Sequence, residues 1–487
     1  MCSAVRSTGM DEYPFLIGGE WRTGAIEPLE ICFPYTGEPF AKVHRAVEQD
    51  CRDAVSCVAG SSRSARILSS GERSRILSEL ADLVKVNTPE FVKILTLEGG
   101  KTRQVAEQEV ARACITLRIS AEEAKRINGE FLPLDWTPDT EGRFGITRRV
   151  SLGPALAIIP FNYPLNLACH KIGPAIASGT PLVLKPASVT PVSSLMLGRL
   201  ALKAGLPPDM LSVVPCSAAT AETMVRDPRI ALLTFTGSPE VGWHLKEIAG
   251  RKKVLLELGG NAAVIVHYDA QLPYAVSRII SGGFTNAGQV CISVQRVYIE
   301  QSIYRSAVAM ILDRIAALKT GDPRDADTDV GPLISTESAI RAETLVQEAV
   351  KEGATLLYGG TRKGALFSPS VLAATTPTMQ VNCEEIFAPV ITLHQYTRFE
   401  EALSEVNRSK FGLQMGVFTN HFPFILQAFE EAEVGGVIVN DIPTFRVDQM
   451  PYGGIKASGT GKEGPRYTIR EMTEEKLLVI NPKGGLP

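Results

Sequence analysis

The segment NAGQVCIS, residues 286–293, places a single cysteine, Cys291, among small and polar residues. A cysteine thiolate is an intrinsically strong nucleophile, and a free thiol is a few per cent ionised near neutral pH. A lone cysteine is nevertheless more often packed in a core, because free cysteine is among the most buried residue types. Cys291 alone leaves both interpretations open, so the choice depends on the residues that accompany it.

Two polar residues upstream follow short apolar runs that have the pattern of strands. Asn162, in PFNYPL, comes after ALAII, and Glu257, in LELGGN, ends an apolar run just before a Gly-Gly turn. An α/β sheet presents functional groups beyond the carboxyl ends of its strands. The structural alternatives are a turn-forming asparagine and a capping carboxylate.

Two further segments offer groups that suit a phosphate. Lys185, in LKPAS, follows the apolar run PLVL, where its ammonium is either a phosphate or hydroxyl donor or a solvated surface charge. The segment FTGSPEVG, residues 235–242, has the pattern of a strand, a glycine turn and a helix that begins near Pro239. Its backbone N–H groups could bind a phosphate, although the segment lacks the G-x-G-x-x-G spacing.

The elements that carry these residues form an α/β pattern. From about residue 153, apolar runs of four to eight residues alternate with segments of helical character, which predicts a doubly wound parallel sheet. A second series of this kind begins near residue 252, and residues 46–125 are predicted to be mainly helical. Residues 126–150 suggest a long hairpin, and the strand-like segment 474–482 could pair with it or with a neighbouring subunit.

The totals exclude several classes of protein. A chain of 487 residues predicts two or three domains, and a net charge of -3 gives no basic surface for a nucleic acid. The nine cysteines have no C-x-x-C spacing and the six histidines no ligand spacing, so we expect neither a disulfide framework nor a metal site. We expect His170 to be a structural histidine. The chain shows no signal-peptide pattern and no long apolar run, which predicts a cytoplasmic protein without a membrane anchor.

Seven segments together resemble the signature segments of the aldehyde dehydrogenase superfamily, in order and over residues 14–480. They are PFNYPL, KPAS, FTGSPEVG, LELGGN, NAGQVCIS, EEIFAPV and MPYGGIKASGTGKEG. The resemblance implies an α/β fold with a Rossmann-type nucleotide-binding domain of residues 1–125 and 148–256. It further implies a catalytic domain of residues 257–465, and a β-hairpin oligomerisation arm of residues 126–147 and 466–487. Pairing through the arm implies a homodimer or homotetramer.

The resemblance also implies a reaction. Cys291 would add to the carbon of a small aldehyde, while the Asn162 amide and the Cys291 backbone N–H bind the oxyanion. The thiohemiacetal would give a hydride to NAD or NADP and leave a thioester, which water activated by Glu257 hydrolyses to the carboxylic acid. Relatives that transfer the acyl group to coenzyme A lack this glutamate, so hydrolysis is favoured. The alternatives are a CoA-acylating dehydrogenase and a catalytically silent relative that serves as a binding or structural protein.

The cofactor site is likewise implied by the resemblance. Lys185 would bind the adenosine ribose, Gly237 and Ser238 the pyrophosphate, and Glu385 and Phe387 the nicotinamide end. The remaining expected cofactor contacts are Ile158, Pro160, Phe161, Ser188, Val241, Gly242 and Leu258. Ser188 stands where many NAD-preferring relatives have a glutamate, which would repel a 2'-phosphate by about 4 kcal/mol at ~4 Å and an effective dielectric constant of ~20. Serine removes that repulsion, so NAD and NADP are equally expected.

The expected substrate contacts are Tyr163, Val290, Arg446 and Arg112. Val290 supplies no charge beside the nucleophile, whereas Arg446 with Arg112 or Arg118 could clamp a carboxylate, phosphate or sulfonate. Salt bridges on their own elements are an equally good explanation of these arginines. We therefore expect a short aldehyde, hydroxylated or anionic, in the range of lactaldehyde, succinate semialdehyde and glyceraldehyde phosphate.

Overall fold

The first sheet carries most of the predicted cofactor residues. The structure, a computed structural model, describes residues 10–61, 65 and 67–484. Five parallel strands form the centre of the sheet: β8 (Ala155–Ile158), β9 (Leu182–Lys185), β10 (Leu211–Val213), β11 (Leu232–Thr236) and β12 (Lys253–Glu257). Antiparallel strands β24 (Gly459–Thr460), β2 (Phe15–Ile17) and β3 (Glu20–Arg22) complete its edges. The predicted parallel α/β sheet is confirmed.

Helices cover this sheet because its strands are apolar on both faces. The crossover helices are α6 (Pro164–Ser178), α7 (Val192–Lys203), α8 (Ala218–Arg226) and α9 (Pro239–Ile248). As predicted for residues 46–125, the chain before the hairpin is mainly helical: α1 (Glu48–Gly60) packs on strands of the sheet, and α3 (Ser70–Val86), α4 (Thr88–Gly99) and α5 (Arg103–Glu123) pack against the crossover helices. Helix α5 packs along α6, which begins directly after Asn162 and Tyr163. This pair of helices forms one wall of the site. A small sheet of β1 (Asp11–Tyr13), β5 (Pro39–Val43) and β4 (Leu29–Cys32) borders the same part of the chain.

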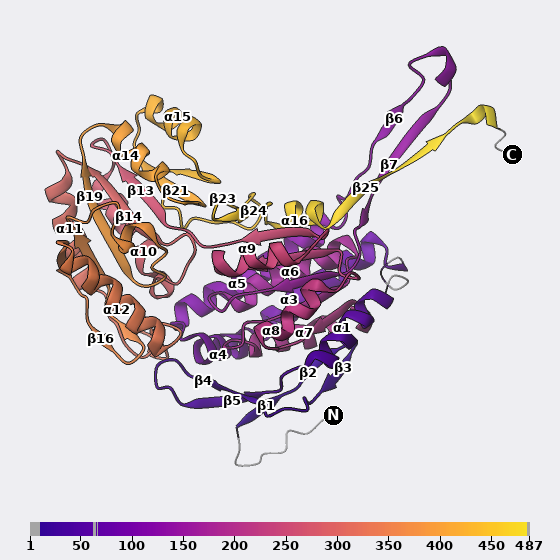
Figure 1. Cartoon of the computed structure of the whole chain (residues 1–487), viewed down its shortest axis with the longest axis horizontal. Coiled ribbons are helices and arrows are strands. Elements are labelled where there is room, and N and C mark those ends of the chain that lie inside the picture. The colour runs from indigo at the N-terminus through magenta and orange to yellow at the C-terminus, as the bar shows by residue number, and fades with distance from the viewer. Residues whose placement is uncertain (1–9, 62–64, 66, 485–487) are drawn as a thin grey trace.

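The second α/β series forms a separate sheet, which Figure 1 shows at the other side of the molecule. Its strands are β15 (Thr355–Tyr358), β18 (Ser370–Ala373), β19 (Val390–Tyr396), β14 (Val294–Glu300), β13 (Ala262–Val266), β21 (Gln414–Phe418) and β22 (Gly436–Val439), in spatial order. The helices of this part are α10 (Leu272–Phe284), α11 (Tyr304–Ala316), α12 (Thr336–Lys351), α14 (Phe399–Asn407) and α15 (Phe422–Glu431). Two apolar clusters, one around Val264 and one around Ile265, pack on this sheet, because successive residues of a strand face opposite sides.

The predicted hairpin forms an arm that projects from the rest of the molecule (Figure 1). Strands β6 (Phe131–Pro133) and β7 (Phe144–Ser151) are antiparallel, and β25 (Thr473–Ile480) pairs along the whole of β7. The strand predicted near residue 474 therefore adds to the hairpin of its own chain. In the described part of the chain, no helix is both long and apolar enough to cross a membrane.

Candidate active site

A cavity of about 250 Å³ lies where the two sheets approach each other. Of the residues predicted to act in the site, fourteen line it: Arg112, Pro160, Phe161, Asn162, Tyr163, Gly237, Ser238, Glu257, Leu258, Val290, Cys291, Glu385, Phe387 and Arg446. These residues come from segments that lie far apart in the sequence. The strand order brings together the groups that the sequence analysis selected one by one.

Cys291 lies in a backbone turn that few residues adopt. Asn286 and Ala287 both have φ of 52°, in the left-handed region that costs energy for residues with a Cβ. Gly288 follows with φ of 71°, and a Cβ there would lie 2.2 Å from the carbonyl oxygen of Ala388, so only glycine fits. The turn places the Cys291 Sγ 2.9 Å from the Tyr452 hydroxyl. Burial raises the pKa of Cys291 to about 12, although the hydrogen bond with Tyr452 acts in the opposite direction. Cys291 is therefore a thiol in the absence of ligands.

Asn162 is held with its amide nitrogen toward the loop of Cys291. Its Nδ2 donates to the carbonyl oxygen of Gln289 at 3.0 Å, and its Oδ1 accepts from the backbone N–H of Tyr163 at 3.1 Å. These two bonds fix which end of the amide faces the loop. The second N–H of the amide remains available to a ligand in the cavity.

Glu257 is the last residue of β12 and is 5% exposed. Its Oε2 has no hydrogen-bond partner among the described residues. Burial raises the pKa of Glu257, and the nearby carboxylate of Glu463 raises it further. A buried carboxyl group of raised pKa, with an oxygen free to bond, suits proton transfer to or from water.

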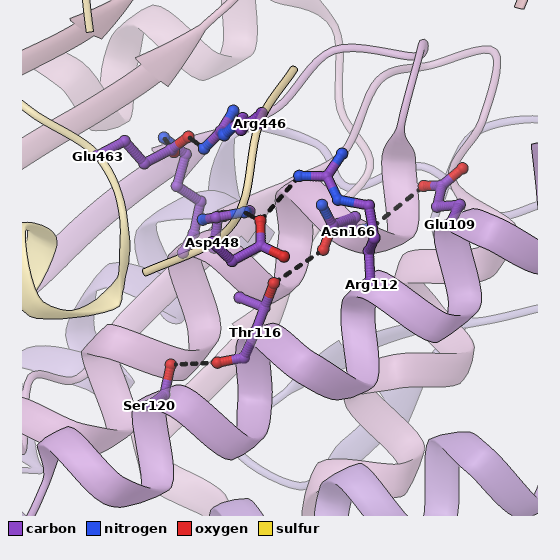
Figure 2. Close-up of polar contacts among 10 residues, drawn as sticks. Glu109, Arg112, Thr116, Ser120, Asn166, Arg446, Asp448 and Glu463 are labelled. Carbon is purple, nitrogen blue, oxygen red and sulfur yellow. Dashed lines mark hydrogen bonds and ion pairs between the residues drawn. The ribbon is translucent and has the colours of Figure 1, made fainter. Parts of the chain in front are cut away.

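Beyond Cys291 the cavity wall carries a network of charged side chains (Figure 2). Glu463 accepts from Arg446 Nη2 with one carboxylate oxygen and from Lys171 Nζ with the other, each at 2.7 Å. Burial alone would raise the pKa of Glu463, but Lys171 and Arg446 hold it well below its usual range. The Arg446 guanidinium also lies 3.7 Å from the centre of the Tyr452 ring. Arg446 is thus fixed beside Tyr452, the hydrogen-bond partner of Cys291.

A second group of the network centres on Asp448. Its Oδ1 accepts from Arg112 Nη2 at 2.8 Å and is 2.9 Å from His170 Nε2. Burial raises the pKa of Asp448, but His170 and Arg112 outweigh this effect and lower it. Burial also lowers the pKa of His170, so its ring is neutral and its Nε2–H donates to Asp448. His170 is a structural histidine in the sense predicted, because it bonds a side chain of the wall and does not line the cavity.

The arginine prediction is wrong for Arg118. Its Nη2 donates to Asp82 at 2.6 Å in an ion pair whose two side chains are both more than half exposed, outside the cavity. Arg112 and Arg446 fit both the anion clamp and the salt bridges that the sequence analysis considered, since each has a carboxylate partner and each lines the cavity. The Nη1 atoms of these two arginines have no partner among the described residues, so both retain donors for a ligand.

The opposite end of the cavity has groups that fit a dinucleotide. Glu385 accepts from the backbone N–H of Gly260 at 3.1 Å, and burial raises its pKa to about 7. The ring of Phe387 meets that of Phe161 edge to face, with centres 5.8 Å apart. Thr236 Oγ1 is buried without a partner in the described chain, and Ser238 begins α9 without a side-chain cap bond. Unpaired hydroxyls at a helix N-terminus suit a phosphate group.

Other predicted cofactor residues lie outside the cavity lining. Ile158 and Lys185 are paired at the ends of neighbouring strands, and burial lowers the pKa of Lys185. Ser188 and Val241 are exposed. Gly242 packs so closely that a Cβ would lie 2.4 Å from the Leu258 side chain, which makes it a packing position for α9. Cofactor contacts of these five residues remain predictions.

The sequence analysis assigned no role to several residues that build the site. They are Asn166, Lys171, Asp448, Tyr452 and Glu463. Tyr452 and Glu463 lie within the motif MPYGGIKASGTGKEG. Their position in a signature segment was the one feature of the sequence that could have marked them as site residues. Nothing in the local sequence pairs Asp448 with His170, which is 278 residues away.

Comparison with known proteins shows to which family of proteins this chain belongs. A family model described as the aldehyde dehydrogenase family matches residues 21–478, and the chain belongs to that family. The chain is an aldehyde dehydrogenase, an oxidoreductase that uses NAD or NADP.

Individual relatives are similar over nearly the whole chain. A protein named 3-sulfolactaldehyde dehydrogenase from Priestia megaterium is 45% identical, with 97% of this chain and 99% of that protein covered. Aldehyde dehydrogenase 21 from Physcomitrella patens, solved in complex with its product succinate, has a TM-score of 0.96 at 40% identity, covering 98% of this chain and 100% of that one. A glyceraldehyde-3-phosphate dehydrogenase from Methanocaldococcus jannaschii, solved with NADP, has a TM-score of 0.90 at 35% identity, covering 94% and 99%.

The pKa of Cys291 predicts how the free enzyme reacts with an alkylating agent. Because only the thiolate attacks, the rate of inactivation by iodoacetamide without cofactor should rise about tenfold per pH unit from pH 7 to 10. Inactivation kinetics with mass spectrometry of the Cys291 peptide measure this rate, and Cys291→Ser provides the control. A rate that levels off near pH 8 would contradict the raised pKa.

The expected position of Ser188 near the adenosine ribose predicts how a carboxylate at residue 188 changes the preference between NAD and NADP. Ser188→Glu should lower kcat/KM with NADP at least about tenfold and leave the value with NAD nearly unchanged, because the new charge repels a 2'-phosphate. Ser188→Gln is the matched uncharged control. An equal loss with both cofactors would mean that residue 188 does not lie near the 2'-position.

Proposed function

We propose that this enzyme oxidises a short aldehyde that carries one negatively charged head group to the corresponding carboxylic acid. The observation that carries the proposal is the pair of guanidinium groups, Arg112 and Arg446, in the cavity of Cys291. Each has an Nη1 without a partner in the described chain. Such donors are strongest toward an ionised acceptor.

The charge of the network supports a singly charged head group. The ion-paired side chains form two groups, Arg112 with Asp448, and Arg446 and Lys171 with Glu463, and their formal charges sum to one positive charge. His170 is neutral, because burial lowers its pKa. A monoanion would neutralise the network. Named relatives are in keeping with this: one is a 3-sulfolactaldehyde dehydrogenase and another was solved with succinate.

Cys291 is proposed as the nucleophile and Glu257 as the base. After the thiol loses its proton, Sγ bonds to the aldehyde carbon, and the resulting oxyanion is stabilised by the Asn162 amide and the Cys291 backbone N–H. The bound cofactor supplies an acceptor for the hydride of that carbon. Glu257 then takes a proton from a water molecule that attacks the thioester carbon, and the Cys291 thiolate leaves.

The cofactor would be held at the other end of the cavity. Ser238 and the first turn of α9 would bind its pyrophosphate, Lys185 the adenosine ribose, and Glu385 with Phe387 its nicotinamide end. The buried, unpaired hydroxyl of Thr236 supports this placement, because it lies where an acceptor could reach it. The corresponding domains would be those predicted from the sequence, joined at Glu257.

The arm is proposed to pair with a second copy of the chain in a homodimer or homotetramer of the cytoplasm. Apolar side chains on its three strands are exposed, among them Phe131, Leu477 and Leu478, each more than half exposed. Apolar patches of this kind commonly mark an interface. The eight cysteines among the described residues are all free, as expected in a reducing compartment.

Glu257→Gln tests the hydrolytic step. The variant should release about one equivalent of NAD(P)H per active site in a burst, and its steady-state rate should then fall by 10²- to 10⁴-fold, because the base for water is gone. Stopped-flow absorbance separates the two phases. A requirement of the wild type for coenzyme A would instead support the acylating alternative.

Arg446→Ala tests the head group. Loss of a hydrogen bond to a charged group predicts that kcat/KM for an anionic aldehyde such as succinate semialdehyde falls about 10- to 100-fold, mainly through KM. The value for propanal should change little. Arg118→Ala, which removes an exposed arginine, is the matched control. Equal effects of Arg446→Ala on both aldehydes would refute an anion site at this residue.

A further inference from the structure

Asn166 lines the cavity beside the two arginines, and its amide has one end free. The residue is 2% exposed and is one of the residues that line the cavity. Its Oδ1 accepts from the Thr116 hydroxyl at 3.0 Å, and its backbone N–H donates to Glu109. The Nδ2 atom has no partner among the described residues and is not sealed from the cavity. A donor is therefore presented where the substrate binds.

The position of this amide is fixed by two helices that are cross-linked at successive turns. Arg112 and Thr116 lie four residues apart on α5, and Asn166 and His170 lie four residues apart on α6, so each pair shares one helix face. Thr116 bonds Asn166 directly, while Asp448 connects Arg112 to His170 (Figure 2). Thr116 and His170 are both fully buried. The amide of Asn166 and the guanidinium of Arg112 are thus held by one rigid assembly.

The donors of this end of the cavity come from three separate side chains. Arg112 and Arg446 each contribute an unpaired Nη1, and Asn166 contributes Nδ2. A carboxylate offers two oxygens in one plane, which a single guanidinium can satisfy. A tetrahedral group such as a sulfonate offers three oxygens in three directions. A phosphate monoester has the same shape but carries a charge near -2 at neutral pH, whereas the network holds one positive charge.

We propose that Asn166 is a specificity-determining residue that donates to the third oxygen of a tetrahedral monoanionic head group, so that the enzyme prefers a sulfonated aldehyde to a carboxylated one. The inference rests on the proposed function and extends it by naming the head group. Arg112 and Arg446 bind any anion, and Asn166 distinguishes its shape.

The test measures kcat/KM of wild type and Asn166→Leu with 3-sulfolactaldehyde, succinate semialdehyde and propanal. The value for the sulfonated aldehyde should fall about 10- to 100-fold, since a donor to a charged oxygen is lost. The values for the other two substrates should fall less than about threefold. Equal losses with the sulfonated and carboxylated substrates overturn the proposal, as does an unchanged value for the sulfonated one.

Two variants on α5 distinguish an effect on the position of the Asn166 amide from a general effect on the folded structure. Thr116→Val keeps the size of the side chain but releases the amide of Asn166, so it should reproduce the selective loss in weaker form. Ser120→Ala removes a hydroxyl one turn farther on, which bonds only the Thr116 carbonyl oxygen, and should leave all three substrates unaffected. A loss with Ser120→Ala equal to that with Thr116→Val would show that the effect is structural and overturn the inference.

A binding measurement gives a readout that does not depend on turnover. The dissociation constant of 3-sulfolactate, measured by calorimetry, should increase about 10-fold or more in Asn166→Leu, while that of succinate changes little. If Arg446→Ala is selective for anions but Asn166→Leu is not, the proposed function stands and only the role of Asn166 fails. If Arg446→Ala shows no selectivity, the proposed function itself fails.

Discussion

The site depends on one short backbone crossing between the two sheets. Strand β12 ends at Glu257 and β13 begins at Ala262, so four residues carry the chain from one sheet to the other. Within this link, a Cβ at Gly260 would lie 2.2 Å from the carbonyl oxygen of Cys291, and a Cβ at Gly259 would lie 2.3 Å from Glu385 Oε2. Only glycine permits the approach at residue 260, which is to backbone, whereas a side chain at residue 259 would displace the Glu385 carboxylate. Glu257 at the end of one strand, the loop of Cys291 and the carboxylate of Glu385 therefore lie close together around a link that has two glycines.

The directions of the pKa shifts in the cavity follow from burial and from ion pairing. Burial raises the pKa of Cys291, Glu257 and Glu385, so none of the three carries its charge as readily as it would in solvent. Asp448 and Glu463 lie equally deep but remain charged, because cations bond them directly. The cavity thus contains groups whose pKa is raised by burial and groups whose charge is fixed by an ion pair.

The sequence predicted the strands, and the residues Asn162, Glu257 and Cys291 that it selected line one cavity, while their chemical roles stay predictions. Apolar runs mark the buried strands, and Asn162 and Glu257 follow such runs immediately. Helix geometry shows only that Arg112 and Arg118 cannot both face the site, because six residues turn about 600° and the two side chains leave α5 on different faces. Which of the two lines the cavity depends on how α5 packs against α6. The Asp448–His170 and Arg446–Glu463 pairs could not be derived in this way, since their geometry depends on how a loop of the second part of the chain folds onto α6.

Pairing each arginine with a carboxylate reduces its attraction for an anion, but an unpaired buried cation is costly in the absence of ligand. Asp448 and Glu463 reduce that cost, and they also fix the guanidinium groups, so that little side-chain entropy is lost when a substrate binds. The pairing leaves one uncompensated positive charge and one free Nη1 on each arginine. A neutral aldehyde would leave this charge buried without a partner, and a dianion would leave a negative excess. In the proposed function, selection by charge would therefore arise from the balance of these ion pairs, and selection by shape would be left to the uncharged donor of Asn166.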